Sequence, residues 1–297
     1  MYLVTGATGG LGRRIVKLLR EREQSVRALV RLNSRYGELE YRGAEILIGD
    51  LRRDRDIARA CQGVQYVISA HGSNASGDGD AQAIDYQANI ELIDQAKAVG
   101  VQHFVFISVL GADRGYDDAP VFKAKYAVER YLQQSGLNYT ILRPSGFASN
   151  LLPLAERFRE TGVYLLVGDP QSRASIVSTD DLARIAVESV TIPAAHRQVL
   201  NVGGPEILQR REIPEVFSRV FNREPILINP PLLVIDGIRS LLGWFNPPAQ
   251  TALGTLRTLL ANEFFCTTDE ILRLESIFQI KMESLEHFLR RYFNLST

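Results

Sequence analysis

The chain has 297 residues, of which 45% are hydrophobic and 23% are charged, a balance typical of a folded globular protein rather than a disordered one. Lys plus Arg and Asp plus Glu both total 34, so no net charge draws the protein to nucleic acid, and we expect no nucleic-acid partner. The two cysteines and four histidines form no ligand pattern, which argues against a disulfide framework and a metal site. No apolar run reaches about 18 residues, so we expect no transmembrane segment. The first predicted strand starts at residue 2, which leaves no room for a leader peptide, and we expect a cytoplasmic protein.

A short apolar run, Tyr2–Thr5, predicts a buried strand, and a helical pattern follows over residues 11–22. Glycines spaced three apart lie between them. A strand, a glycine turn and a helix in that order form a phosphate-binding unit, because glycine permits a tight turn and the helix N-terminus attracts anions. We therefore expect a dinucleotide site in which the cofactor contacts Gly6, Thr8, Gly9, Gly10, Leu11 and Gly12.

The strand expected over residues 25–31 ends in a basic residue, Arg31. In NAD-binding units an acidic residue in this region takes the ribose hydroxyls, and its carboxylate would repel the 2′-phosphate of NADP. A guanidinium binds a phosphate instead, so Arg31 favours NADP(H) over NAD(H). The alternative is that Arg31 is a solvated charge at a strand end.

Strands and helices alternate up to residue 108, which predicts a Rossmann-type, doubly wound parallel sheet of the α/β class. Ligands of such sheets bind at the carboxyl ends of the strands. Further cofactor-contact candidates stand at three of these ends: Asp50 and Leu51, Ser69 and Ala70, and Ser108. Asp50 has an alternative role as the N-cap of a helix starting near Asp54. We expect His71 to be a loop residue rather than a catalyst.

The glycine spacing G-x-x-G-x-x-G resembles that of the short-chain dehydrogenase/reductase superfamily, in its extended and atypical branches. Members of that superfamily normally act through a Tyr-x-x-x-Lys pair, in which the tyrosine gives a proton to the substrate. Here Val121 stands four residues before Lys125, and Ala119 stands four residues before Lys123. The usual catalytic pair is therefore missing in either register.

Lys125 with Glu129 four residues on, followed by the segment 135–144, resembles the NmrA-like atypical branch of that superfamily. That branch includes isoflavone-type and divinyl chlorophyllide reductases, photosystem II assembly factors and a complex I accessory subunit. The resemblance implies that Lys125 contacts the cofactor and serves as the catalytic residue in proton transfer. The alternative is that Lys125 and Glu129 form an ordinary pair on the surface of a helix. Tyr126 would face away from Lys125, so we rank it low as a proton donor.

The strand expected at 140–143 ends at Pro144, and the turn that follows carries Phe147. The nicotinamide would lie at this turn, which makes Pro144 and Phe147 candidates for contact with it. We divide the chain here into a dinucleotide-binding domain, residues 1–147, and a smaller, mixed, helix-rich substrate lobe with an apolar helical tail, residues 148–297. The second part is interleaved with the first and is not an independent domain.

Helices are expected in the second part at 152–159, 210–221 and 252–265, with a helix capped near Ser178 and a final amphipathic helix near the C-terminus. The apolar stretch at 230–265 has two explanations. It caps the substrate lobe, or it forms an apolar helical surface for a membrane interface or a larger protein complex.

Two functional hypotheses follow. The first is an NADPH-dependent oxidoreductase that transfers hydride to a carbonyl or an activated double bond of a small apolar substrate. The alternative is a non-catalytic dinucleotide-binding assembly factor, accessory subunit or redox sensor, peripheral on a membrane complex. The glycines and Arg31 fit both hypotheses, whereas the missing tyrosine and the apolar tail favour the second.

Overall fold

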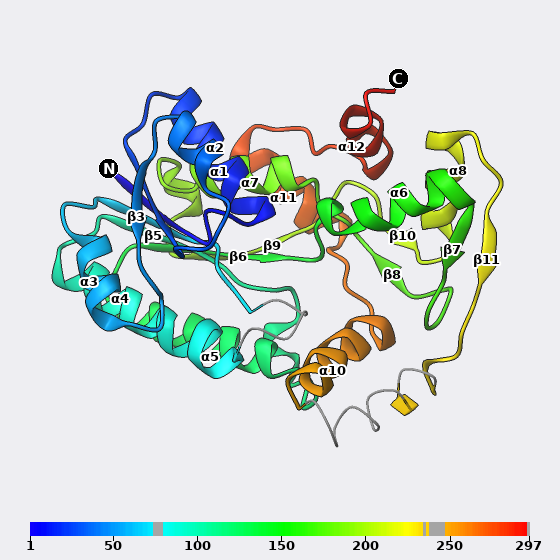
Figure 1. The fold of residues 1–297 in the computed structure, drawn as a ribbon, viewed down its shortest axis with the longest axis horizontal. Helices are drawn as coiled ribbons and strands as arrows, with labels where there is room; N and C mark the ends of the chain where they lie inside the picture. The colour runs from blue at the N-terminus through cyan, green and yellow to red at the C-terminus, as the bar shows by residue number, and fades with distance from the viewer. Residues whose placement is uncertain (74–79, 234–235, 238–246, 296–297) are drawn as a thin grey trace.

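The computed structural model describes residues 1–73, 80–233, 236–237 and 247–295, and its centre is a seven-stranded parallel sheet (Figure 1). The strand order is β3-β2-β1-β4-β5-β6-β9. The strands are β1 (Tyr2–Thr5), β2 (Val26–Val30), β3 (Glu45–Ile48), β4 (Tyr66–Ser69), β5 (His103–Ile107), β6 (Tyr139–Pro144) and β9 (Gln198–Val202). The order reverses between β1 and β4, which is the switch point of a doubly wound sheet and confirms the predicted fold class.

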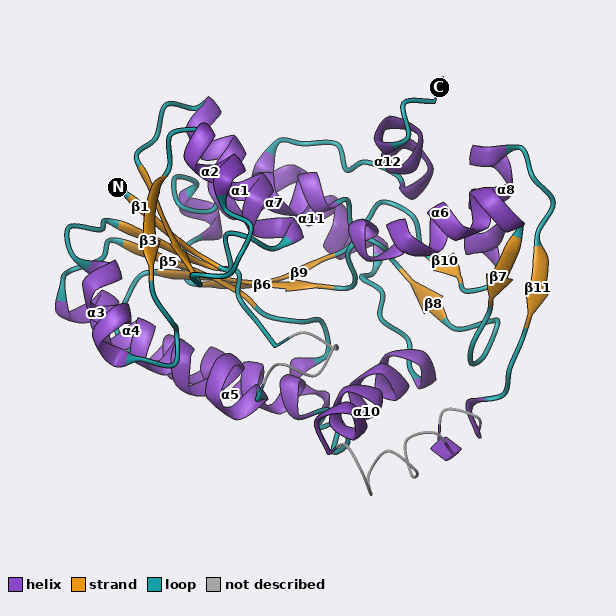
Figure 2. Cartoon of the chain, viewed as in Figure 1, coloured by secondary structure: helices purple, strands orange, loops and turns teal. Residues whose placement is uncertain are grey.

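Helices cover both faces of the sheet (Figure 2). On one face lie α1 (Gly10–Glu21), α2 (Gly37–Tyr41), α7 (Thr179–Glu188) and α11 (Thr268–Phe278), and on the other α3 (Asp54–Cys61), α4 (Ala88–Ala98) and α5 (Pro120–Gln134). Alternate residues of a strand point to opposite faces of the sheet, so their side chains pack in two different cores. Val4 of β1 joins Ile15 of α1 in one core, whereas its neighbour Leu3 joins Leu92 of α4 in the other. Because both faces are covered, the central strands are continuous apolar runs.

The C-terminal lobe is built around a third core that contains Phe158, Phe217 and Phe288. Two small sheets belong to this lobe, one pairing β8 with β10 and the other pairing β7 with β11. Its elements are α6 (Leu152–Thr161), β7 (Val163–Leu165), β8 (Arg173–Ala174), β10 (Leu208–Gln209), α8 (Glu212–Phe221), β11 (Ile226–Ile228), α10 (Pro247–Ala261) and α12 (Leu285–Tyr292). Short helical turns lie at η1 (Ala81–Gln87), η2 (Ala112–Arg114), η3 (Ala148–Leu151) and η4 (Pro193–Ala195).

The region before the final helix differs from the sequence-based expectation in two ways. The helix expected at 252–265 is instead α10, which spans Pro247–Ala261. It ends earlier than expected because Phe264 is buried and forms a β-bridge with Ala174. Helix α11 was not predicted, although Thr267 and Glu270 form a capping box at its start. Much of the apolar stretch at 230–245 lies outside the described residues.

The C-terminal tail is joined by ion pairs to the helix layer that carries the glycine turn. Asp180, in the first turn of α7, pairs with Arg14 of α1 at 2.8 Å and with Arg291 of α12 at 2.6 Å. Ser178 caps α7 by accepting a hydrogen bond from the Asp181 N–H, as the sequence predicts. Within the described part of the chain, no helix is long and apolar enough to span a membrane.

The close packing of α1 on the turn after β1 depends on Gly12. A Cβ atom at this position would lie 2.2 Å from the carbonyl oxygen of Gly6, which is a backbone atom and cannot rotate away. At Gly10, on the same helix, a Cβ atom would meet the Ser149 hydroxyl at 3.6 Å and the Arg14 guanidinium at 4.0 Å, both at ordinary contact distance.

We therefore expect Gly12→Ala to destabilise the protein by about 1–3 kcal/mol, the usual cost of overpacking, in urea unfolding experiments. Gly10→Ala is the matched control and should not lower stability, because the helical site has room for a methyl group. A Gly12→Ala protein as stable as the Gly10→Ala protein would contradict this account of the packing.

Candidate functional site

The turn between β1 and α1 has a backbone geometry that only glycine fits. Gly6 has a φ angle of +67°, and a Cβ atom there would lie 2.6 Å from the carbonyl oxygen of Ala70. The N–H of Gly9 donates to the Gly6 carbonyl at 3.0 Å. Gly9 is also the N-cap of α1, no described side chain caps this end of the helix by a hydrogen bond, and both Gly9 and Gly10 are exposed. The first N–H groups of α1 therefore face an open site at the positive end of the helix dipole, which fits a pyrophosphate.

Two arginines, Arg31 and Arg13, lie at the loop that follows β2. Arg31 is the first residue after the strand and is exposed. Arg13 of α1 donates from Nε to the carbonyl of Thr8 at 3.0 Å and from a terminal nitrogen to the carbonyl of Arg35, so it joins the glycine turn to this loop. Glu38 lies near the same loop, but its carboxylate pairs with Arg13 at 3.1 Å. A phosphate at this end of β2 would therefore meet Arg31 rather than a free carboxylate.

Asp50 and Leu51 follow the edge strand β3. Hydrogen bonds from the Arg52 guanidinium, at 2.7 Å, and from the Arg52 backbone N–H, at 2.9 Å, hold the pKa of Asp50 below its usual value. The alternative role of Asp50 as a helix cap is wrong, because α3 begins at Asp54 and Arg53 occupies its N-cap. Leu51 is half-buried against the core beneath α3 and α4.

A buried set of hydrogen bonds joins the ends of β1 and β4. Nδ1 of His71 lies 2.8 Å from the hydroxyl of Thr5 and 3.2 Å from that of Ser69. Ser69 donates to the side-chain oxygen of Asn89 at 2.6 Å. Burial lowers the pKa of His71 to about 3, so its ring is neutral near pH 7. His71 thus lies in a loop, as expected, with a buried ring that holds two strand ends together.

Lys125 lies on the buried face of α5 and reaches the end of β5. Its Nζ donates to the carbonyl of Ile107 at 2.9 Å and lies 3.8 Å from Oδ1 of Asp85. Burial lowers the pKa of Lys125, whereas the charges of Asp85 and Glu129 act in the opposite direction. Lys125 and Glu129 are only 8% and 1% exposed, so the alternative of a pair on the helix surface is wrong.

Glu129 belongs to a second buried ion pair. Its carboxylate accepts a hydrogen bond from Nε of Arg143 at 2.9 Å and another from the hydroxyl of Ser108. Arg143 also pairs with Asp113 at 2.6 Å. Ser108 therefore lies at the end of β5, as expected, with its hydroxyl directed at Glu129.

The neighbourhood of Lys125 on α5 does not restore the missing tyrosine. Val121 stands one helical turn earlier, and Tyr126 is 37% exposed whereas Lys125 is buried, so the two side chains point in different directions. On the next strand, Pro144 ends β6 and Phe147 forms a bridge with Val177. Phe147 is half-buried against the core on the α1 side of the sheet.

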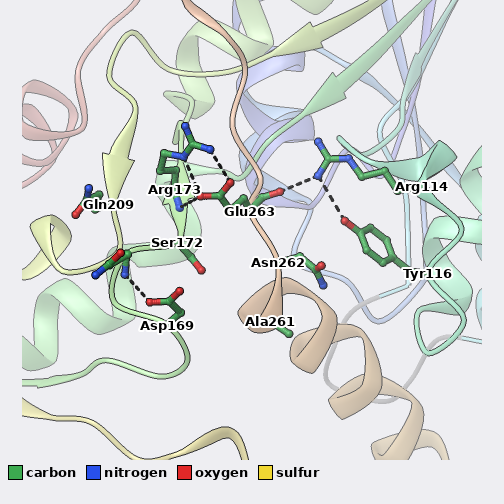
Figure 3. Close-up of a pocket in the computed structure, with 10 residues that line it drawn as sticks. Arg114, Tyr116, Asp169, Ser172, Arg173, Gln209, Ala261, Asn262 and Glu263 are labelled. Carbon is green, nitrogen blue, oxygen red and sulfur yellow. Dashed lines mark hydrogen bonds and ion pairs between the residues drawn. The ribbon is translucent and has the colours of Figure 1, made fainter.

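A cavity of about 750 Å³ lies between the loop after β5, strand β8 and the end of α10 (Figure 3). Arg173 and Glu263, which both line it, form an ion pair at 2.8 Å, and Arg114 donates to the backbone carbonyl of Glu263 at 2.7 Å. The residues that line it are Arg114, Tyr116, Asp169, Gln171, Ser172, Arg173, Gln209, Ala261, Asn262 and Glu263. Its lining is polar.

Sequence reasoning missed Asp85 and Asn89, which lie beside Lys125 and Ser69. Asn89 donates to the backbone carbonyl of Asp85 at 2.9 Å, and both side chains are fully buried. The two residues stand four apart in a helix whose inward face is otherwise apolar. In the sequence, the signal that could have identified them was the presence of two polar residues at inward-facing positions of an otherwise apolar helix face.

Several known proteins are similar to this chain. Residues 6–193 match a family described as NAD(P)H-binding. The Photosystem II assembly factor Ycf39 of Cyanophora paradoxa is 27% identical over 296 residues, which cover 98% of this chain and 92% of that protein. The NAD(P)H azoreductase of Xenophilus azovorans is 33% identical over 226 residues, 75% of this chain and 74% of the azoreductase.

A solved structure shares the fold. The NADPH-dependent quinone oxidoreductase of Escherichia coli, solved with NADPH, superposes with a TM-score of 0.78 at 20% identity, covering 99% of this chain and 100% of the other. The shared fold therefore extends over nearly the whole chain. The chain therefore belongs to the NAD(P)H-binding family, and its cofactor is a nicotinamide dinucleotide.

Proposed function

We propose that the protein is an NADP(H)-dependent reductase acting on a carbonyl or an activated double bond. The observation that carries this proposal is the convergence of the glycine turn and the buried Lys125 at the carboxyl ends of β1, β4 and β5. An open helix N-terminus binds the pyrophosphate, and a buried amine beside it is placed for the nicotinamide ribose or for proton transfer. When bound, the cofactor supplies a hydride from C4 of the nicotinamide.

The cofactor-contacting residues follow from their strand ends. Asp50 and Leu51 take the adenine side, and Ser69 and Ala70 allow phosphate and ribose to approach. On the nicotinamide side, the cofactor contacts Ser108, Lys125, Pro144 and Phe147. Thr8 and Leu11 complete the glycine turn, with Leu11 contributing only its backbone because its side chain is in the core.

The preference for NADP(H) rests on the end of β2. Arg31 is exposed there, and the described chain shows no ion pair that occupies it. A guanidinium makes stronger, charge-assisted hydrogen bonds to a 2′-phosphate than to the neutral hydroxyl of a ribose.

A second candidate is a non-catalytic nucleotide-binding assembly factor, and two observations favour it. The Ycf39 relative aligns over nearly the whole chain, including the C-terminal part that lies beyond the match to the NAD(P)H-binding family. The tyrosine of the usual catalytic pair is also absent, with Val121 at its position. This candidate requires nucleotide binding without turnover, so the two proposals can be separated by measurement.

The assignment of Arg31 is tested with Arg31→Ala. Loss of a charge-assisted hydrogen bond costs about 1.5–3 kcal/mol, so NADPH affinity should fall roughly 10-fold to 100-fold, whereas NADH affinity should change little. The two affinities can be compared by fluorescence titration. Equal losses for both nucleotides would contradict the 2′-phosphate assignment.

The reductase proposal is tested by following NADPH consumption with a panel of azo compounds, carbonyls and activated double bonds. We expect turnover with at least one class and a loss of about 100-fold or more in Lys125→Met, the usual scale for acid–base groups. Lys123→Met, an exposed lysine on the same helix, is the control and should retain activity. NADPH binding without consumption of any compound would favour the assembly factor, and turnover unchanged in Lys125→Met would remove the lysine from the mechanism.

A further inference from the structure

Asp85 is a fully buried carboxylate that no step of the proposed reaction uses. It lies in η1, a π-helical turn that precedes α4, and it is 0% exposed. Its Oδ2 accepts hydrogen bonds from the backbone N–H of Ser73, at 3.1 Å, and from the Ser73 hydroxyl. Its Oδ1 has no hydrogen-bond partner in the described part of the chain. A buried carboxylate oxygen without a donor is costly unless a cation lies nearby.

That cation is Lys125, whose Nζ lies 3.8 Å from this oxygen. The ammonium also lies over the ring of Phe106, 5.2 Å from its centroid, and donates to the Ile107 carbonyl. An aromatic face and one carbonyl cannot replace the water that the ammonium has lost, so burial favours the neutral amine. The Asp85 carboxylate acts against that loss of charge.

The other titratable groups around Lys125 are less suited to this role, because the charge of Glu129 also favours the ammonium but its oxygens already have partners. Glu129, on the same helix, is engaged by Arg143 and by the hydroxyl of Ser108. His71, on the loop after β4, stays neutral near pH 7 because burial lowers its pKa to about 3. Asp85 is therefore the carboxylate whose free oxygen faces the ammonium.

The pair lies directly beneath the backbone that follows β4. A Cβ atom at Gly72 would lie 3.0 Å from Oδ1 of Asp85 and 3.8 Å from Nζ of Lys125. Two residues earlier, the carbonyl of Ala70 packs against Gly6 of the glycine turn. The pair and the glycine turn thus border the same short segment at the switch point of the sheet.

We propose that Asp85 is a positioning residue for Lys125: its buried carboxylate keeps the ammonium charged and directed at the carboxyl end of the sheet, beside Gly72. This proposal rests on the proposed contact between Lys125 and the cofactor. It assigns no proton transfer to Asp85 itself.

The test measures the titration of Lys125 without nucleotide, by NMR of protein labelled with ¹³C-lysine. The chain has five lysines, and Lys125→Met assigns the signal by removing it. In Asp85→Asn the titration midpoint of Lys125 should fall by about one pH unit or more, the usual effect of removing an opposite charge at this range. The control is Asp117→Asn, which removes an exposed carboxylate paired with Lys123 at 2.7 Å and should leave the midpoint of Lys125 unchanged. An unchanged midpoint in Asp85→Asn would overturn the proposal.

NADPH affinity as a function of pH separates positioning from a merely structural role. Lys125 is charged below its pKa, so native protein and Asp85→Asn should bind NADPH equally at low pH. As the pH rises, NADPH affinity should fall in both proteins. The fall should come at a lower pH in the variant, and the difference should equal the change in the titration midpoint of Lys125. An equal loss of affinity at every pH would show a structural role and overturn the proposal. NADPH binding by Lys125→Met equal to native binding at every pH would instead refute the proposed function of Lys125, while the titration still reports on the pair.

If Asp85→Asn folds poorly, the double variant Asp85→Asn/Lys125→Met decides the matter. Removing the unpaired amine should raise the thermal midpoint above that of Asp85→Asn alone, because the buried charge that lost its partner is gone. A double variant no more stable than Asp85→Asn would show that Asp85 acts only through Ser73 and would overturn the proposal.

Discussion

The site depends on the close approach of two backbone segments at the switch between β1 and β4. Gly6 lies against the carbonyl of Ala70, and Gly12 lies against the carbonyl of Gly6, with no space for a side chain at either glycine. This contact fixes the start of α1 above the sheet, so its first N–H groups face the crevice. Every other candidate group is placed relative to that helix end, because the neighbouring strands end along the same edge of the sheet.

Beneath this edge the protein buries two ion pairs, Lys125 with Asp85 and Arg143 with Glu129. Removing charges from water is expensive, and such pairs seldom stabilise a fold more than apolar side chains of the same size would. Their concentration at the carboxyl ends of β4, β5 and β6 is therefore better explained by function than by stability. Ser108 donates a further hydrogen bond to Glu129 of the Arg143–Glu129 pair, whereas Oδ1 of Asp85 in the Lys125–Asp85 pair has no donor among the described residues.

The sequence was sufficient for features that depend on local pattern. The parallel sheet, the glycine turn and the capped start of α7 all follow from spacing and alternation within short windows. The surroundings of Lys125 did not follow, because Asp85 lies forty residues away in the chain and reaches it only through the packing of α5 against η1. Likewise, the end of α10 is set by Phe264, which leaves the helix to pair with Ala174, a contact that no local pattern encodes.

Hydrogen exchange of the backbone amides, with and without NADPH, tests the placement of the cofactor most directly. NADPH should slow exchange at Gly9–Arg13, in the loop that begins at Arg31, and at 70–73 after β4. These segments border the crevice at the switch point. Protection confined to the cavity around Arg173, with exchange at the glycine turn unchanged in protein saturated with NADPH, would contradict this account.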